Sequence, residues 1–233
     1  MVNNWLKIIQ RKLVPPRCAL CGDTGFADFD LCAGCLDDLP RNLRCCYRCG
    51  EPFESEIALP SLCGRCLKRS PQFDETYAPY LYRYQMPYLI GQLKFGRDYK
   101  NARLLALLLG EHIAADAELP ELLLPMPLHP HRYRERGFNQ SIEIARHLAR
   151  RFELPLDLYS VVRSRDTLHQ TGLPAKQRRK NMRGAFRLQK SLKADHVAIV
   201  DDVMTTGATA SALAGVLKQA GVGRVDVWVC ARA

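Results

Sequence analysis

From residue 77 onward, the chain alternates short apolar runs with longer amphipathic runs. The continuous apolar runs at 197–200 and 225–230 predict buried strands. The runs at 101–117 and 138–152 place their apolar residues on one face at helical spacing, and therefore predict helices. Strands that alternate with helices are typical of a mainly parallel sheet flanked by helices on both faces. The pattern thus predicts an α/β fold for this part of the chain.

The same reasoning predicts smaller elements around this framework. Strands are expected at 77–84, 122–124 and 158–162, and helices at 87–95 and 208–220.

The first 17 residues form a separate amphipathic segment that ends at Pro15-Pro16. The pattern favours a short helix that docks on the protein over one that lies on a membrane surface. It is not typical of a signal peptide, because Lys7 interrupts the apolar run and no small-residue cleavage site follows. No run approaches the roughly 18 apolar residues of a membrane helix. We therefore expect a cytoplasmic protein without membrane insertion.

Cysteine divides the chain into unlike parts. Nine of the ten cysteines lie between Cys18 and Cys66, in a segment rich in Gly, Pro and Asp that lacks long periodic runs. A total of 233 residues suits one medium domain and one small module. With turn residues at Ser70-Pro71, we expect a helix at 1–17, a cysteine-rich module at 18–70 and the α/β domain at 71–233.

Eight cysteines form four Cys-x-x-Cys pairs. In a reducing cytoplasm such pairs indicate metal rather than disulfides, and two pairs complete one tetrahedral zinc site. Four pairs in so short a segment predict two closed, structural Zn²⁺ sites rather than a redox motif. The expected ligands are Cys18, Cys21, Cys32, Cys35, Cys46, Cys49, Cys63 and Cys66.

The spacing leaves the pairing of these motifs open. Sequential pairing (first with second, third with fourth) and a crossed arrangement are both compatible with it. Cys45 competes with Cys46 for the third pair, although Cys46 has the standard separation from Cys49. Cys230, in an apolar terminal strand, is interpreted as a small buried hydrophobe.

Positive charge is concentrated in one region. The chain has a formal net charge of +10, and residues 129–193 contain 16 Lys and Arg against 5 Asp and Glu. The rest of the chain is nearly neutral. This concentration favours a polyanionic ligand.

The stretch at 197–209 carries the most specific chemistry. A buried apolar strand ends in Asp201-Asp202, and a turn of Thr205-Thr206-Gly207-Ala208-Thr209 then opens a helix. Backbone N–H groups, hydroxyls and the positive helix end can hold one phosphate, and Gly207 allows close approach. The two carboxylates can accept hydrogen bonds from ribose hydroxyls. The expected ligand is a ribose with a 5′-phosphate.

The strand, the acidic doublet and the threonine-rich turn resemble the phosphoribosyl pyrophosphate (PRPP) motif of type I phosphoribosyltransferases. Further motifs narrow the resemblance to the ComF/GntX family, and it covers nearly the whole chain. These motifs are the cysteine pairs, Leu93-Lys94-Phe95, Pro125-Met126-Pro127-Leu128 and Arg136-Gly137-Phe138-Asn139-Gln140.

The resemblance implies a type I phosphoribosyltransferase fold behind a double zinc ribbon. It also implies that Asp201 and Asp202 hold the ribose hydroxyls, that Thr205 to Thr209 hold the 5′-phosphate, and that PRPP binds with Mg²⁺. In such a fold the basic segment 127–139 is the pyrophosphate loop, from which we select Arg136 and Asn139 as PRPP contacts.

Two further segments and one residue are assigned less directly. Residues 163–174 resemble the mobile loop that type I enzymes close over PRPP, which excludes water. The basic residues Arg178, Arg179 and Lys180 suit either PRPP closure or contact with a DNA backbone. Lys94 is a candidate for the hood over the acceptor base, with a core or surface role equally compatible.

Two functions remain open from the sequence. The first is a PRPP-binding, phosphoribosyltransferase-like protein, which the resemblance implicates in uptake or use of external DNA or in nucleotide salvage. The second is a non-catalytic competence factor that binds single-stranded DNA with PRPP as a regulatory ligand, together with DNA-uptake or DNA-processing proteins. A zinc-ribbon docking scaffold is a weaker third. Neither the acceptor base nor turnover follows from the residues.

Overall fold

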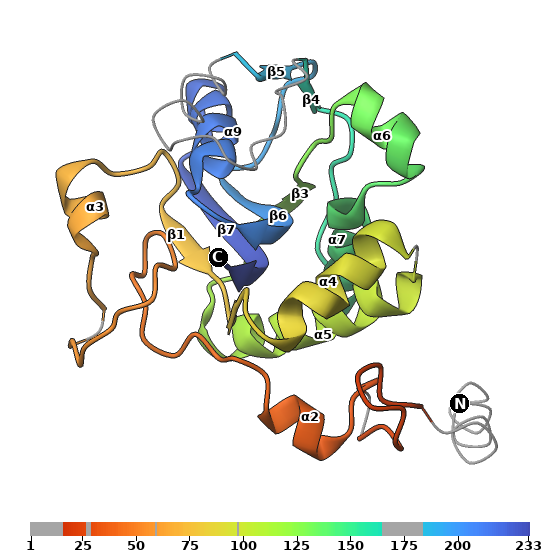
Figure 1. The fold of residues 1–233 in the computed structure, drawn as a ribbon. Coiled ribbons are helices and arrows are strands. Elements are labelled where there is room, and N and C mark those ends of the chain that lie inside the picture. The colour runs from red at the N-terminus through yellow and green to blue at the C-terminus, as the bar shows by residue number, and fades with distance from the viewer. Residues whose placement is uncertain (1–15, 27–28, 59, 97, 165–183) are drawn as a thin grey trace.

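A five-stranded parallel sheet forms the centre of the molecule (Figure 1). The computed structural model describes residues 16–26, 29–58, 60–96, 98–164 and 184–233. The strand order of the sheet is β1-β7-β6-β3, and β2 also pairs with β7. The strands are β1 (Glu75–Tyr77), β2 (Tyr80–Leu81), β3 (Leu122–Pro125), β6 (His196–Met204) and β7 (Arg224–Arg232). The expected parallel sheet is therefore confirmed.

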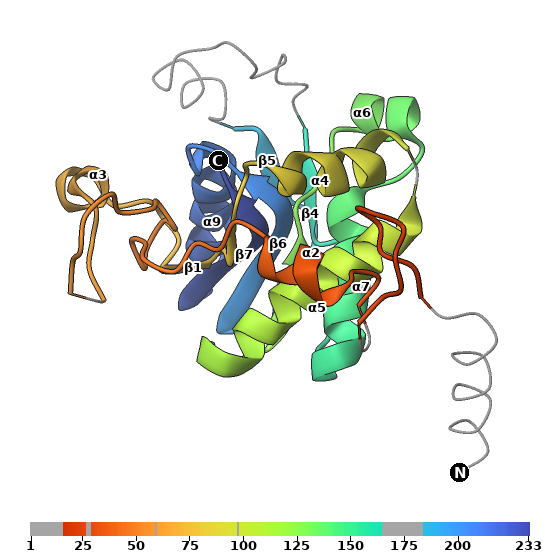
Figure 2. The same cartoon turned by 60° about the horizontal axis from the view of Figure 1, so that its bottom comes forward.

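Helices cover both faces of this sheet. On one face lie α4 (Gln85–Phe95), α5 (Tyr99–Asp116) and α7 (Gln140–Phe152), and on the other lies α9 (Ala208–Gln219) (Figures 1 and 2). Strand β6 serves both faces because its side chains alternate. Ala198 and Val200 belong to the core under α5 and α7, whereas Val197 and Ile199 belong to the core under α9.

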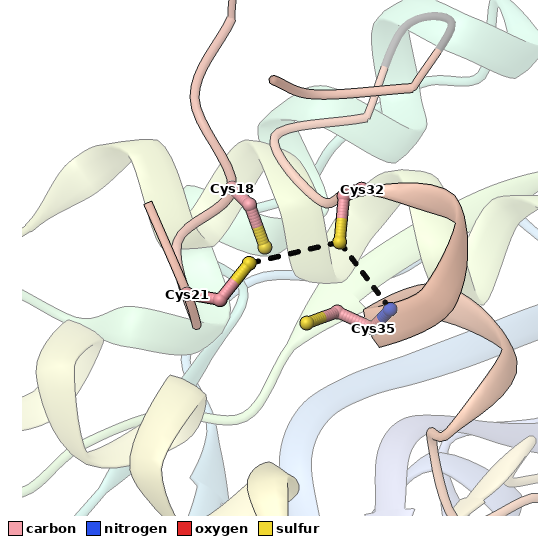
Figure 3. Close-up of side chains that lie close together, drawn as sticks. All are labelled: Cys18, Cys21, Cys32 and Cys35. Atoms are coloured by element: carbon pink, nitrogen blue, oxygen red, sulfur yellow. Dashed lines mark hydrogen bonds between the residues drawn. The ribbon is translucent and has the colours of Figure 1, made fainter. Parts of the chain in front are cut away.

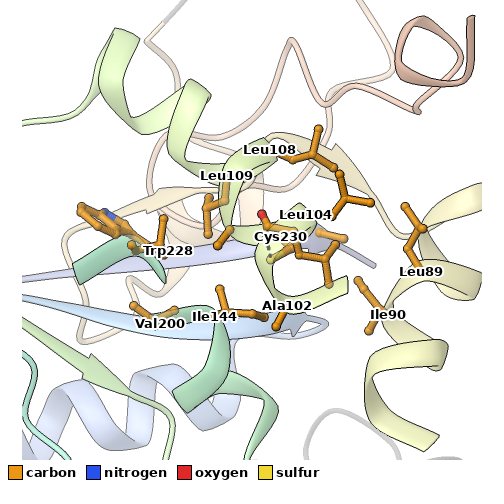
Figure 4. Close-up of a cluster of buried hydrophobic side chains, with 14 of the residues drawn as sticks. Leu89, Ile90, Ala102, Leu104, Leu108, Leu109, Ile144, Val200, Trp228 and Cys230 are labelled. Carbon is orange, nitrogen blue, oxygen red and sulfur yellow. Dashed lines mark hydrogen bonds between the residues drawn. The ribbon is translucent and has the colours of Figure 1, made fainter. Parts of the chain in front are cut away.

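The larger of the two hydrophobic cores lies between the sheet and the helices α4, α5 and α7. Trp228 is fully buried and packs edge-on against Phe152, with ring centroids 6.1 Å apart. Cys230 lies in the same cluster, among Leu104 and Ile144 (Figure 4). The interpretation of Cys230 as a small buried hydrophobe is confirmed, since it is buried and belongs to neither cysteine cluster.

Several elements differ from the expected ones. The strand expected at 77–84 is divided into β1 and β2 around Pro79, which has no N–H to donate to a neighbouring strand. The basic segment contains a helix, α6 (Pro130–Arg136), where a loop is expected. The strand expected at 158–162 is the short β4 (Val161–Arg163), which pairs antiparallel with β5 (Phe186–Leu188) outside the main sheet.

The cysteine-rich segment adds two short helices, α2 (Ala33–Asp37) and α3 (Gly64–Lys68). Its two halves contact different parts of the α/β unit (Figure 2). The first half reaches α5 through an ion pair of 2.7 Å between Asp30 and Arg103. The second half reaches β1, where the Thr76 hydroxyl donates to the Arg48 carbonyl at 2.8 Å. The boundary at residue 70 stays a prediction.

The expected N-terminal helix at 1–17, except its last two residues, lies outside the described residues, as do Arg178, Arg179 and Lys180. Within the described ranges, no helix has both the length and the apolar character required to cross a bilayer.

A network of charged side chains joins the amino-terminal ends of β1, β6 and β7. Asp226, 1% exposed, contacts the His196 Nε2 atom at 2.8 Å and the Arg224 guanidinium at 3.1 Å. Arg224 also pairs with Glu75 at 3.0 Å and with the exposed Glu118 at 2.7 Å. A buried carboxylate without partners is costly, so Asp226 depends on this network and holds the strands in register.

We expect Asp226→Asn to lower the free energy of unfolding by about 2 kcal/mol, because a buried amide has one acceptor oxygen where the carboxylate offers one to Arg224 and one to His196. Glu118→Gln is the matched control, and loss of this exposed pair should cost less than about 1 kcal/mol. Urea titration measures both. Equal and small losses of stability for the two variants would contradict the role of Asp226 in holding the strands in register.

Candidate functional site

Two neighbouring carboxylates, Asp201 and Asp202, lie near the carboxyl end of β6, which continues through Val203 and Met204 instead of ending at the doublet as expected. The Asp201 Oδ1 atom accepts hydrogen bonds from the Ser141 hydroxyl at 2.8 Å and from the Asp202 N–H at 2.9 Å. Asp202, 3% exposed, accepts the Val203 N–H through Oδ1 at 2.9 Å. In parallel α/β sheets, ligands bind outside the carboxyl ends of the strands. The doublet therefore stands where such a fold places its ligand.

The Asp201 carboxyl is hard to ionise. Burial, and then the charge of Asp202, raises its pKa from 3.8 to about 7, although the hydrogen bond from Ser141 opposes the shift. A carboxyl with this pKa changes its protonation state near neutral pH. Perturbed carboxyls of this kind concentrate at functional sites.

Lys94, at the end of α4, balances the doublet. Its Nζ atom lies 2.6 Å from Asp202 Oδ2. Burial would lower the pKa of Lys94, but the charges of Asp202 and Asp201 outweigh burial and raise it. The ammonium is therefore held charged against the carboxylates.

The threonine-rich turn follows β6 directly. Gly207 has a left-handed φ of 73° and is the N-cap of α9. A Cβ atom there would lie 3.4 Å from both Met204 and Phe73. The Ala208 N–H donates to the Thr206 hydroxyl oxygen at 3.4 Å, and the first helical turn has N–H groups without intrahelical partners. The turn thus has the elements of a phosphate site.

A cavity of about 280 Å³ shares Lys94 with the doublet. It is also lined by Phe95, Arg132, Glu135 and Arg136. The Arg136 guanidinium lies 5.7 Å from the centroid of the Phe95 ring, and burial lowers its pKa. Three cationic side chains against one carboxylate suit an anionic ligand.

Asn139 lies deeper than Arg136. It is the N-cap of α7: its Oδ1 atom accepts the Ser141 N–H, and its Nδ2 atom donates to the Met126 carbonyl, both at 3.0 Å. These bonds fasten the segment after β3 to the start of α7.

The cysteines form two clusters by sequential pairing. Cys18, Cys21, Cys32 and Cys35 form the first cluster (Figure 3), and Cys46, Cys49, Cys63 and Cys66 form the second. In each, the sulfur atoms all lie within 4.8 Å of one another. The crossed alternative is wrong. Cys45 belongs to neither group, so Cys46 is the ligand candidate.

The cluster geometry fits zinc. A tetrahedral site with zinc–sulfur bonds of about 2.3 Å has sulfur–sulfur edges of about 3.8 Å. The contacts that join the paired motifs are 3.7 Å between Cys21 and Cys32, and 3.6 Å between Cys49 and Cys63. All four ligands of each site come from the chain, which is typical of structural rather than catalytic zinc.

Sequence reasoning missed two partners of the doublet. Ser141 reaches Asp201 from 60 residues away, and no local pattern marks it. Lys94 is a candidate for the hood over the acceptor base or for a core or surface role, and no pattern predicts the ion pair that it forms with Asp202. Of the expected mobile loop, only the first two residues are described.

Comparison with known proteins agrees with this architecture. Residues 9–67 match the double zinc ribbon domain, and residues 139–233 match the phosphoribosyl transferase domain. The chain is 34% identical over 226 residues to DNA utilization protein YhgH of Salmonella typhimurium, covering 94% of this chain and 98% of the relative. It is 35% identical over 225 residues to DNA utilization protein YhgH of Escherichia coli K12, covering 94% and 98%.

A relative with a different name is similar to this chain over nearly its whole length. Competence protein F of Haemophilus influenzae is 35% identical over 228 residues, covering 93% of this chain and 97% of the relative. The double zinc ribbon supports two structural zinc ions at the two clusters. Since these relatives match nearly end to end, the chain belongs to the ComF/GntX family.

Proposed function

We propose that the protein binds Mg²⁺–PRPP at the doublet and the threonine-rich turn, as a phosphoribosyltransferase-type protein that acts in the use of external DNA. The observation that carries this proposal is the position of Asp201 and Asp202 near the end of β6, with only Val203 and Met204 between them and a helix-opening phosphate turn. The phosphoribosyl transferase match supports the ligand, and the names of the relatives support the setting.

Each part of PRPP has a complementary part of the site. The ribose hydroxyls donate to Asp201 and Asp202, and the 5′-phosphate accepts from the turn Thr205–Thr209. The pyrophosphate occupies the cavity that Arg136 and Arg132 line. Bound magnesium supplies charge neutralisation on the pyrophosphate.

We propose that Lys94 changes its partner when PRPP binds. In the free protein it offsets the negative charge of Asp202. When ribose hydroxyls take its place at Asp202, the ammonium turns to the pyrophosphate in the adjoining cavity, because Lys94 also lines that cavity. If an acceptor attacks C1′ of the sugar, pyrophosphate is the leaving group. Catalysis then comes from positioning the acceptor and the sugar, and from stabilising the negative charge of the departing pyrophosphate.

A second candidate is binding of single-stranded DNA. Tyr84, Tyr88 and Phe95 are exposed on or beside α4 at spacings of four and seven residues, which places them along one side of the helix. Exposed aromatic rings near cationic side chains are typical of surfaces on which bases stack. Arg178, Arg179 and Lys180 remain the proposed contacts to the phosphate backbone.

We expect the double variant Asp201→Asn/Asp202→Asn to bind Mg²⁺–PRPP at least about 100-fold more weakly, because two hydrogen bonds to charged acceptors are lost. Isothermal titration measures the affinity. Asp116→Asn, an exposed change at the end of α5, is the matched control and should bind like wild type. If the double variant retains wild-type affinity, the proposed ribose site is wrong.

The affinity for ribose 5-phosphate should rise as pH increases through about 7, because Asp201 then loses its proton and becomes the stronger acceptor. Ser141→Ala removes a hydrogen bond that lowers the pKa of Asp201, so the midpoint should move to higher pH. The ligand has its own ionisation near pH 6, but this is the same for both proteins. Superimposable profiles would argue against Asp201 as a ligand contact.

Neutralising Arg178, Arg179 and Lys180 to Ala should weaken binding to single-stranded DNA. It should also reduce the slope of log affinity against log salt by about 2, because about three phosphate contacts are lost. Fluorescence anisotropy over a salt series measures both. Arg146→Ala/Arg150→Ala, on the exposed side of α7, is the control. An unchanged slope, with weaker Mg²⁺–PRPP binding instead, would assign these residues to PRPP closure.

A further inference from the structure

A buried arginine connects the second cysteine cluster to the phosphate turn. Arg232, near the end of β7, is 3% exposed and lies opposite Met204 of β6 in the sheet register. Its Nε atom donates to the Cys49 carbonyl at 3.0 Å, and its Nη1 atom donates to the Met204 carbonyl at 3.3 Å. Cys49 belongs to the second cluster, and Met204 immediately precedes the turn.

Glu51 completes this connection. It forms an ion pair with Arg232 and a second one, at 2.9 Å, with Arg65. Arg65 in turn donates to the Cys49 Sγ atom at 3.7 Å. A buried guanidinium is tolerated only when its donors are satisfied, and its rigid fork fixes the relative positions of its acceptors. Here, two of those acceptors lie in the cysteine-rich segment.

The chain that leaves the second cluster gives an independent connection. The Gln72 N–H donates to the Ser211 hydroxyl in the first turn of α9, at 3.1 Å. Phe73, fully buried, lies against Gly207, where a Cβ atom would be 3.4 Å from its ring. Asp74 pairs with Lys218 of α9 at 2.6 Å. These three residues therefore hold the helix that opens at the turn.

The first cluster is placed differently. Its Cys18 belongs to the core that α5 and α7 share, and Asp30, between its paired motifs, pairs with Arg103 of α5. Cys46, Cys49 and Cys66 instead belong to the core with Phe73 and Met204. Figure 1 shows the second half, with α3, beside β1, and the first half below α5.

We propose that the second cluster, when it holds zinc, supports the phosphate turn, and that Arg232 is the positioning residue that links the two. This inference rests on the proposed function, because it requires the turn to bind a 5′-phosphate. A ribbon with little core of its own loses its structure without metal. Arg232 would then lose Cys49 and Glu51 as partners, and the turn would lose its fixed geometry.

The first test compares two ligands, ribose 5-phosphate and Mg²⁺–pyrophosphate, by isothermal titration on the full chain. Arg232→Met should weaken ribose 5-phosphate binding about tenfold (about 1.4 kcal/mol). Arg232→Lys retains the charge and should restore part of it. Pyrophosphate affinity should stay within about twofold, because that ligand binds on the α6 side. Equal losses for both ligands would indicate general destabilisation and overturn the inference.

A milder pair of variants covers the case in which Arg232→Met does not fold. Glu51→Gln weakens the partner of Arg232, and should reduce ribose 5-phosphate affinity about threefold. Glu56→Gln is the matched control: Glu56 forms an exposed pair with Arg44 on the same half of the cysteine-rich segment, so affinity should not change. Indistinguishable affinities for the two variants would overturn the inference.

A third test removes one zinc ligand from each cluster and compares the effects on ribose 5-phosphate binding. Cys63→Ser and Cys35→Ser should each reduce the zinc content, measured by atomic absorption, from two to about one per chain. Cys63→Ser should also weaken ribose 5-phosphate binding about tenfold, and Cys35→Ser less than about threefold. The reverse ranking, or equal losses, would overturn the inference. Wild-type protein that binds no ribose 5-phosphate would overturn the proposed function as well, which separates the two failures.

Discussion

Two like charges on adjacent residues of a buried strand are the constraint on which the rest of the site depends. Asp201 and Asp202 cannot both remain ionised at the end of β6 without compensation, because burial and mutual repulsion oppose it. The fold compensates with a hydrogen bond from Ser141 and an ion pair with Lys94. Residues from α7 and α4 therefore converge on one edge of the sheet, and a polyol ligand can replace these contacts with its own hydroxyls.

The cysteine-rich segment follows from a different limitation. It is too short and too polar to form a core alone, so metal coordination and docking on the α/β unit take the place of a core. Its two halves dock on different parts of that unit, one on α5 and one on β1 and the end of β7. Through Arg232, the second half contacts the carboxyl end of β6, because this guanidinium donates to both the Cys49 and the Met204 carbonyls.

Local patterns predicted the parts of the structure that depend on local spacing. The four Cys-x-x-Cys pairs and the strand–doublet–turn motif are each contained in a few residues, and the alternation of strands and helices gives the parallel sheet. The pairing of the cysteine motifs was not predictable, because both arrangements satisfy the same spacing. Ser141 and Arg232 reach their partners from 60 and 183 residues away. For α6 the sequence does contain a local signal, which is Pro130 in the first helical turn after His129 as N-cap.

The proposed function requires the doublet and the turn to hold one phosphorylated ribose together. A crystal structure of the protein soaked with Mg²⁺–PRPP would show whether they do. We expect both ribose hydroxyls on Asp201 and Asp202, the 5′-phosphate within the turn Thr205–Thr209, and the Lys94 ammonium displaced from Asp202. Density for the sugar elsewhere, or an empty site with the Lys94–Asp202 pair intact at saturating ligand, would contradict it.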